Sequence, residues 1–282
     1  MKNALLATLG FCFFFSLQIV LQKKFLITQI NPLQMNFLMS LTSFILLTIY
    51  GLIFNKKIIS FKLNKNVFKY FLLATFLWII ADLSAIFGLK LSSSVNYSIL
   101  SRLTVFATYF MAVLFFKESF FINKVFAVFL SLLGGFLLVY NFKSSIIINP
   151  GDLLFLSFAI FVSLSGLFRQ KITKYLNPIH LTYLMFGLST LTLGILTFFL
   201  APLQKFVIPQ FIIVISILGL LGFNLVNYAI SKGGASFFSV VSSLLPLFTA
   251  IFAFLILGTL PLINQLIGGA IIIISIYIFQ KK

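Results

Sequence analysis

Residues 116–140 read FKESFFINKVFAVFLSLLGGFLLVY, and residues 257–281 read LGTLPLINQLIGGAIIIISIYIFQK. Aligning Asn123 with Asn264 superimposes the two segments at an offset of half of the 282-residue chain. In each segment an apolar run follows the asparagine. A match at this spacing predicts that the chain is built from two similar halves, as are many membrane proteins that move solutes.

The earlier parts of the two halves also correspond. The same offset aligns Tyr97 with Phe238. NPLQMNFLMS begins at residue 31 and NPIHLTYLMF begins at residue 177, at a slightly different offset that indicates a small insertion or deletion. The correspondence therefore extends over most of each half rather than over one helix.

The composition is that of a membrane protein. Hydrophobic residues make up 61% of the chain and charged residues 8%, with a mean hydropathy of +1.20, whereas soluble domains are about half apolar and about a quarter charged. The formal net charge is +17, but the basic residues are scattered between apolar runs, so we expect no nucleic-acid partner. The single cysteine, Cys12, lies in an apolar run and excludes an intrachain disulfide.

Ten apolar windows are long enough to cross a bilayer as helices. Each half holds five of them, and with this odd number two similar halves must enter the membrane from opposite sides. We therefore expect an all-α polytopic membrane protein, made of two inverted-topology repeats over residues 1–141 and 142–282. The windows lie near residues 4–21, 33–54, 67–89, 94–116, 122–140, 151–168, 179–200, 209–230, 235–257 and 261–280.

Lysines and arginines in the short loops orient the chain. With the N-terminus inside, most of these basic residues fall in cytoplasmic loops, among them Arg169, Lys171 and Lys174. The first window lacks a small-residue cleavage site and is followed by Lys23 and Lys24, so we interpret it as a retained helix rather than a signal peptide. We expect a multi-pass protein of the inner (plasma) membrane with both termini in the cytoplasm.

The end of each half follows one order of features: an apolar helix, a short turn with small residues, a second apolar helix and a Gly-bearing helix. The second of these helices carries a central proline in the second half only, and an acidic residue follows it in the first half only. The segments are GLKLSSSVNYSILSRLTVFATYFMAVLFFKESF and AISKGGASFFSVVSSLLPLFTAIFAFLILGTLP. In this order and its duplication the chain resembles the EamA type of the drug/metabolite transporter superfamily. The family-like proline is Pro246 and the family-like acid is Glu118; the other copies hold Val105 and Thr259. The resemblance implies a transporter of small polar metabolites.

One arginine and one aspartate fall inside the predicted spans. A guanidinium at mid-bilayer, as at Arg102, costs between about 2.5 kcal/mol and 10 kcal/mol or more. Asp82 lies ten residues before the turn near residue 92 and Arg102 ten residues after it, so both lie roughly 15 Å along their helices and we expect them to meet. The pair either makes Arg102 tolerable, or it lines a cavity in which Arg102 binds a substrate carboxylate or phosphate and Asp82 accepts a proton.

Polar residues follow helical spacing in both halves, and Ser98, Arg102 and Tyr109 form one such stripe in the first half. Such stripes either line a cavity or join helices by hydrogen bonds. Pro246 frees a backbone carbonyl and predicts either a kink used in gating or a static bend. Besides Arg102 and Asp82, the candidate substrate-binding residues are Ser98, Tyr109, Asn224, Asn227, Tyr228, Ser239 and Ser243.

A secondary transporter that works by alternating access is the leading interpretation, and both exchange and proton coupling fit it. No histidine follows His180 to activate a serine, and there is no HExxH motif for zinc, so we expect no catalytic residues, metal or cofactor. A channel-like or structural membrane protein is the alternative. The expected partners are a small-molecule substrate and the lipid bilayer. Whether the chain forms a homodimer stays open.

Overall fold

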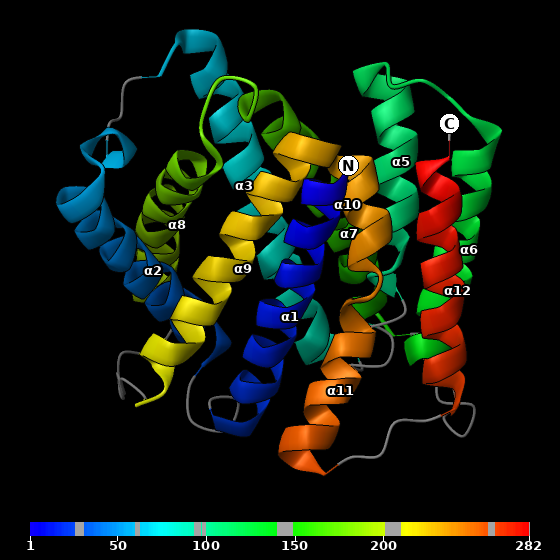
Figure 1. Ribbon diagram of the computed structural model, residues 1–282. Helices are drawn as coiled ribbons and strands as arrows, with labels where there is room; N and C mark the ends of the chain where they lie inside the picture. The colour runs from blue at the N-terminus through cyan, green and yellow to red at the C-terminus, as the bar shows by residue number, and fades with distance from the viewer. Residues whose placement is uncertain are drawn as a thin grey trace.

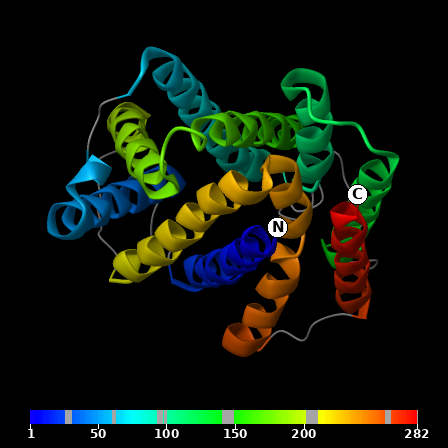
Figure 2. The same cartoon turned by 45° about the horizontal axis from the view of Figure 1, so that its top comes forward.

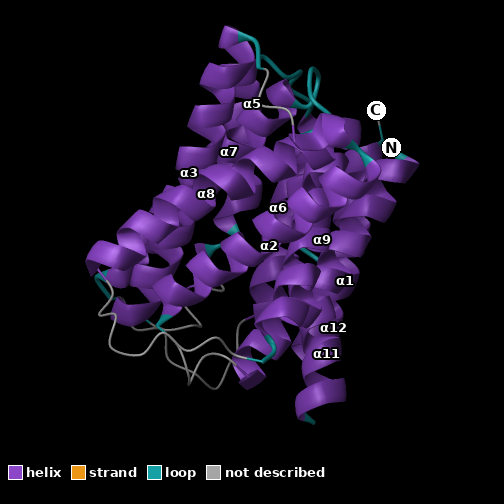
Figure 3. Cartoon of the chain, turned by 90° about the vertical axis from the view of Figure 1, so that its left-hand side faces the viewer, coloured by secondary structure: helices purple, strands orange, loops and turns teal. Residues whose placement is uncertain are grey.

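The computed structural model describes residues 1–25, 31–59, 63–92, 97, 100–139, 149–200, 210–258 and 263–281. Every regular element in these ranges is a helix (Figure 3). The first half contributes α1 (Lys2–Phe25), α2 (Pro32–Phe54), the 3₁₀ turn η1 (Lys56–Ile59), α3 (Lys65–Leu91), α5 (Leu103–Phe116) and α6 (Ile122–Val139). The second contributes α7 (Gly151–Ile172), α8 (Pro178–Leu200), α9 (Ile212–Gly233), α10 (Ala235–Ser242), α11 (Leu245–Leu257) and α12 (Ile263–Gln280).

The helices have the lengths and apolar surfaces of membrane spans. Within the described residues, seven helical stretches are long and apolar enough to cross a bilayer, and three shorter apolar helices accompany them at 103–116, 122–137 and 266–280. Large apolar side chains such as Leu114 and Ile263 are exposed on the outside of the bundle, where a soluble protein would place polar groups. The prediction of an all-helical membrane protein is confirmed.

The NP dipeptides shared by the two halves begin corresponding helices. Asn31 precedes α2, and its Oδ1 accepts a hydrogen bond from the backbone N–H of Leu33 at 3.0 Å. Asn177 precedes α8, and its Oδ1 accepts from Ile179 at 3.3 Å. In each case the asparagine caps the helix, while the proline occupies the first position, where its missing N–H costs nothing.

The predicted spans 94–116 and 235–257 are interrupted at equivalent places. The chain turns at Ser101 and Arg102 immediately before α5, and again at Ser243 and Leu244 between α10 and α11. Pro246 is therefore the second residue of α11, at the start of a helix rather than in its middle. Interruptions of this kind free backbone groups and side chains at the depth of a central site.

The two halves pack as an inverted pair. Helices in corresponding positions pack on each other, α6 on α12 and α2 on α8, and these two pairs stand at opposite sides of the bundle (Figures 1 and 2). Between them α3 packs on α7 and α1 packs on α9, which are equivalent contacts once the halves are exchanged. Both chain ends lie at one end of the bundle (Figure 1), which we call the terminal end; the opposite one is the far end.

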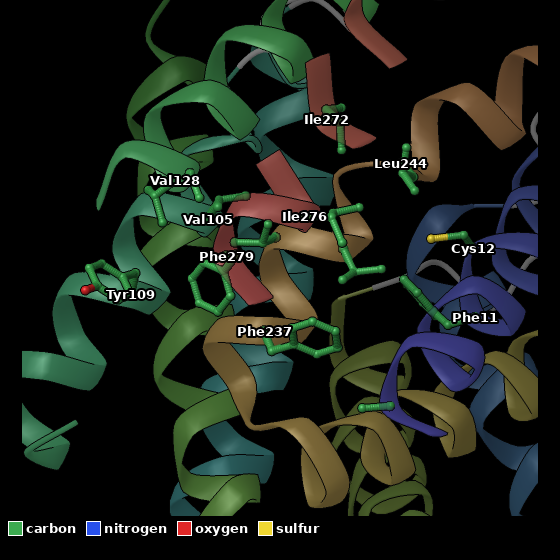
Figure 4. Close-up of a cluster of buried hydrophobic side chains, with 14 of the residues drawn as sticks. Phe11, Cys12, Val105, Tyr109, Val128, Phe237, Leu244, Ile272, Ile276 and Phe279 are labelled. Carbon is green, nitrogen blue, oxygen red and sulfur yellow. The ribbon is translucent and has the colours of Figure 1, made fainter. Parts of the chain in front are cut away.

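Two buried hydrophobic clusters lie on either side of the bundle centre. One joins α1, α5, α6, α9, α10 and α12 and includes Val105, Phe237 and Ile276 (Figure 4). The other joins α2, η1, α3, α7 and α8 and includes Phe71 and Leu181. Each cluster contains helices from both halves, so neither half is a separate folding unit in this arrangement.

The contact of α6 with α12 depends on small residues, among them Gly134 and Gly268. A Cβ atom added to Gly134 would lie 2.7 Å from the carbonyl oxygen of Gly268 and 2.8 Å from Cγ1 of Ile272. Helices in bilayers associate through such close fit.

Replacing Gly134 with alanine should therefore destabilise the protein, by about 1–3 kcal/mol as for other overpacked sites. Thermal unfolding of the purified protein in detergent measures this effect. The matched control is Gly222→Ala in α9, where the nearest atom is 3.6 Å away. Equal stability of the two variants would contradict close packing at Gly134.

Candidate functional site

A cavity of about 440 Å³ lies between the two halves. Helices from both halves line it, and its walls combine aromatic rings, among them Trp78, Phe158 and Phe223, with polar side chains. The polar residues that line it are Gln18, Asn36, Ser40, Ser43, Asp82, Tyr97, Ser101, Arg102, Thr104, Thr108, Ser163, Arg169, Ser216, Ser239 and Ser242. A mostly apolar pocket with a few convergent polar groups is typical of small-molecule sites.

Arg102 enters this cavity from the turn that precedes α5. Its aliphatic stem packs against α6, where a Cβ added to Gly135 would lie 3.0 Å from Cδ of Arg102. Its Nη2 donates one long hydrogen bond, 3.3 Å, to Oγ of Ser101. Its Nε is buried and has no hydrogen-bond partner within the described part of the chain.

Asp82 lines the same cavity from α3. Its Oδ2 accepts a hydrogen bond of 2.8 Å from Nδ2 of Asn36 in α2. Among the described residues no ion pair joins Asp82 to Arg102, so the expected direct contact between the two charges is wrong. Asp82 is held toward α2, whereas Arg102 packs on α6.

Asp82 and Arg102 do not meet because of the order of the helices. Their depths along the helices agree with the prediction. Oγ of Ser163 in α7 accepts from Thr108 in α5 at 2.9 Å, and Ser165 donates to the carbonyl of Ala74 in α3 at 2.7 Å. Arg102 precedes Thr108 by six residues, which places it about 9 Å from the level of Ser163 toward the far end. Asp82 follows Ala74 by eight residues, and Ser163 precedes Ser165 by two, so Asp82 also lies about 9 Å from the level of Ser163 toward the far end. However, α7 packs between α3 and α5, and its width separates the two charges.

A second arginine, Arg169, reaches the same cavity from the last turn of α7. It is only 4% exposed. Its Nη1 donates to Oδ1 of Asn227 at 3.3 Å, and its guanidinium carbon lies 5.3 Å from the ring centroid of Phe223. The sequence analysis assigned Arg169 to a cytoplasmic loop with its lysine neighbours. The feature that distinguishes Arg169 from those lysines is that the chain has only one other arginine.

Unsatisfied polar atoms concentrate in this cavity. In the described part of the chain, four buried side-chain nitrogen or oxygen atoms have no hydrogen-bond partner. Three of them belong to residues that line the cavity, namely Gln18, Arg102 and Arg169. Buried polar groups in proteins are almost always satisfied, by protein or by ordered water. The cavity therefore offers donors of Arg102 and Arg169 and an acceptor of Gln18 to water or to a bound polar molecule.

The serine-rich helix of the second half contributes in part as expected. Ser239 lines the cavity and donates to the carbonyl of Ser236 at 2.8 Å. Ser243 instead joins the halves, because its Oγ accepts a hydrogen bond of 2.8 Å from Ser131 in α6. Pro246 lies close behind Ser243 in the sequence, in the first turn of α11.

The three candidates on α9 lie around the cavity rather than in its lining. Asn227 is fully buried, where it accepts from Arg169 and donates to Thr182 of α8 at 2.9 Å. Asn224 accepts from the same threonine at 3.4 Å. Tyr228 points to a separate hollow at the terminal end, where Nζ of Lys232 lies 5.7 Å from its ring. Asn227 thus positions Arg169, and Tyr228 takes no part in the central site.

Two candidates on the first half also fall away from the cavity lining. Tyr109 lies in the hydrophobic cluster of α6, α10 and α12 (Figure 4), and its hydroxyl donates to the carbonyl of Phe121 at 3.3 Å. The stripe that joined Tyr109 to Arg102 assumed one continuous helix, whereas the turn at residues 101–102 breaks that spacing. Ser98 lies outside the described residues.

The sequence model of the EamA-like transporter family matches residues 2–140 and again residues 149–280. The chain belongs to the EamA-like transporter family. The family consists of membrane transporters and not of enzymes, and membership implies that the chain moves small molecules across a membrane. Each of the two family matches covers one half of the fold, in agreement with the repeat.

The fold of this EamA-like transporter also occurs in a solved structure. The crystal structure of a protein with 12% sequence identity superimposes with a TM-score of 0.82, over 99% of this chain and 97% of that one. At this identity the match shows the fold alone. No curated protein sequence matches the chain.

A polar network joins the two halves of this EamA-like transporter at the terminal end of the bundle. Glu118, which follows the end of α5, accepts 2.9 Å hydrogen bonds from Gln170 of α7 and from Ser236 of α10. Oε1 of Gln170 accepts from the backbone N–H of Ala235 at 2.7 Å. We call these four residues the latch. It joins the family-like acid of the first half to two helices of the second half.

The separation of Asp82 from Arg102 makes a prediction for a double variant. If the two charges formed a structural pair, removing both would restore the function lost on removing one. Because they are not in contact, Asp82→Asn combined with Arg102→Gln should be no more active than Arg102→Gln alone. Transport assays on reconstituted protein compare the three variants, and recovery of wild-type activity by the double variant would contradict the structure.

Proposed function

We propose that the chain is a secondary transporter that moves a small polar metabolite bearing a carboxylate or phosphate across the inner (plasma) membrane by alternating access. The observation that carries this proposal is the set of buried, unsatisfied nitrogen and oxygen atoms in one cavity between inverted halves. A guanidinium is the side chain best suited to bind either anion, because its donors match both oxygens of a carboxylate.

Arg102 is the proposed anchor for the substrate anion. It lies next to the helix interruption, with its stem fixed against α6, and its Nε has no partner among the described residues. A substrate anion would offset the cost of holding this charge in the membrane. Asp82, which accepts a hydrogen bond from Asn36, is the proposed proton acceptor if transport is coupled to protons, whereas exchange requires no such step.

Alternating access follows from the two proposed repeats, residues 1–141 and 142–282. The two inverted halves can exchange their equivalent contacts. This exchange gives two states, and each state is open at a different end of the bundle. In the structure the latch connects the halves at the terminal end. The distribution of lysine and arginine supports a cytoplasmic position for this end and for both termini, so the latch is the proposed cytoplasmic gate.

The proposal is tested on purified protein in two steps. A thermal-shift screen of metabolites identifies compounds that stabilise the protein, since a ligand stabilises the state that it binds. Each hit is then measured in proteoliposomes, where we expect saturable uptake that is accelerated by unlabelled compound inside. Conductance that does not saturate and shows no counterflow would instead support the channel alternative, and absence of both would support a structural role.

A further inference from the structure

We infer that the substrate carries two anionic groups separated by a spacer, and that Arg169 forms the second anion subsite. This inference rests on the proposed function, in which Arg102 binds one anion. Both arginines line one cavity, and neither forms an ion pair within the described residues. Two guanidiniums that share a cavity with one carboxylate, and form an ion pair with none of the described residues, are costly unless the bound molecule supplies an anionic partner for each of them.

The two arginines enter the cavity at different depths along the bundle. The hydrogen bond between Thr108 and Ser163 sets a common level on α5 and α7, two helices that run in the same direction. Arg102 precedes Thr108 by six residues, and Arg169 follows Ser163 by six. The helical rise therefore separates their backbones by about 18 Å along the bundle. A molecule with an anion at each end can contact both side chains when its length matches the gap between the two guanidiniums.

The surroundings of Arg169 are those of a prepared binding site. Asn227 occupies one of its five N–H donors and, through Thr182, is itself fixed to α8. The guanidinium carbon lies over the ring of Phe223, which packs against Trp78 with centroids 4.7 Å apart. Nε of Arg169 is buried and has no hydrogen-bond partner in the part of the chain that the structure describes. These contacts hold the side chain in one orientation while leaving donors for a ligand.

The wall between the two arginines suits a spacer rather than further charge. It carries the hydroxyl groups of Thr104, Thr108 and Ser163 together with the rings of Phe158 and Phe223. Asp82 contributes the third charge at the Arg102 end. With a proton on Asp82, a dianion neutralises the two arginines.

The test uses the full-length protein in detergent and a series of straight-chain dicarboxylates from succinate to sebacate, each paired with the monocarboxylate of the same length. Binding is measured by thermal shift and by calorimetry. We expect one or two of the dicarboxylates to bind at least about tenfold more tightly than their paired monocarboxylates, as a second charged hydrogen-bonded contact provides. No preference for any dicarboxylate over its monocarboxylate would overturn the inference.

Variants assign the effect to Arg169. Arg169→Gln should abolish the preference for the dicarboxylate, by lowering dicarboxylate affinity by at least about tenfold more than monocarboxylate affinity, and Arg169→Lys should retain part of the preference. The matched control is Lys174→Gln, which removes an exposed charge from the same end of the bundle. Equal loss of affinity for both probes in Arg169→Gln would overturn the inference. It would mean that Arg169 passes a single anion along the cavity or that it has a structural role.

The same series separates this inference from the function on which it rests. Binding and counterflow of monocarboxylates that depend on Arg102, without any preference for two charges, would remove the second subsite and keep the proposed transporter. Failure of every anion to bind the wild-type protein would remove both proposals.

Discussion

Transport by the Arg102→Gln variant is expected to fall at least about 30-fold, since removing one partner of a buried charge pair costs about 2–5 kcal/mol. Glutamine preserves much of the length of the side chain and its packing on Gly135, but it removes the positive charge that the substrate anion needs. Initial rates of uptake into proteoliposomes, with the hits of the metabolite screen, measure this loss.

Two controls show whether the loss is specific. The variant must elute from size exclusion as wild type does, and its unfolding temperature without ligand should not fall, because the variant no longer holds an uncompensated charge in the membrane. Lys174→Gln removes one exposed charge at the terminal end and should transport normally. Wild-type transport by Arg102→Gln would exclude Arg102 as the anchor.

Glu118→Ala is expected to shift the protein toward the state that is open at the terminal end. The substitution removes two hydrogen bonds of 2.9 Å to the second half, and loss of charged hydrogen bonds should change the balance between states at least about tenfold. A cysteine at position 239, inside the cavity, reports the shift through its rate of alkylation from the side of the termini. The background for this probe is Cys12→Ala, which removes the native cysteine.

Neighbouring substitutions set the scale of this effect. Ser236→Ala removes one of the two bonds to Glu118 and should produce a smaller shift in the same direction. Ser157→Ala removes a hydroxyl that bonds within its own helix on the exposed surface, so it should leave the alkylation rate unchanged. An unchanged rate in Glu118→Ala as well would mean that the latch does not hold the terminal end closed.

The architecture was predictable because it depends on local signals that the sequence repeats. Apolar windows of membrane length gave the helices, and the NP dipeptides marked the starts of α2 and α8 through the capping by Asn31 and Asn177. The odd number of helices in each repeat then required inversion. The equal depth of Asp82 and Arg102 was also predictable, since it needs only the helical rise and the position of one turn.

The site was less predictable because it depends on which helices are neighbours. Helical spacing cannot show that α7 lies between α3 and α5, and this position of α7 is what separates Asp82 from Arg102. The turn at residues 101–102 changed the face on which Tyr109 lies. Arg169 was missed because a basic residue near a span end is usually a loop residue; only the packing of α7 on α9 directs it into the cavity.

The account depends on one cavity between inverted halves that opens to each side of the membrane in turn. Alkylation of a cysteine at position 239, in the Cys12→Ala background, tests this most directly when the reagent is applied separately to right-side-out and inside-out vesicles. The account predicts labelling from both sides, and protection from both sides by a compound that the protein transports. Labelling from one side only, with no effect of any transported compound, would contradict it.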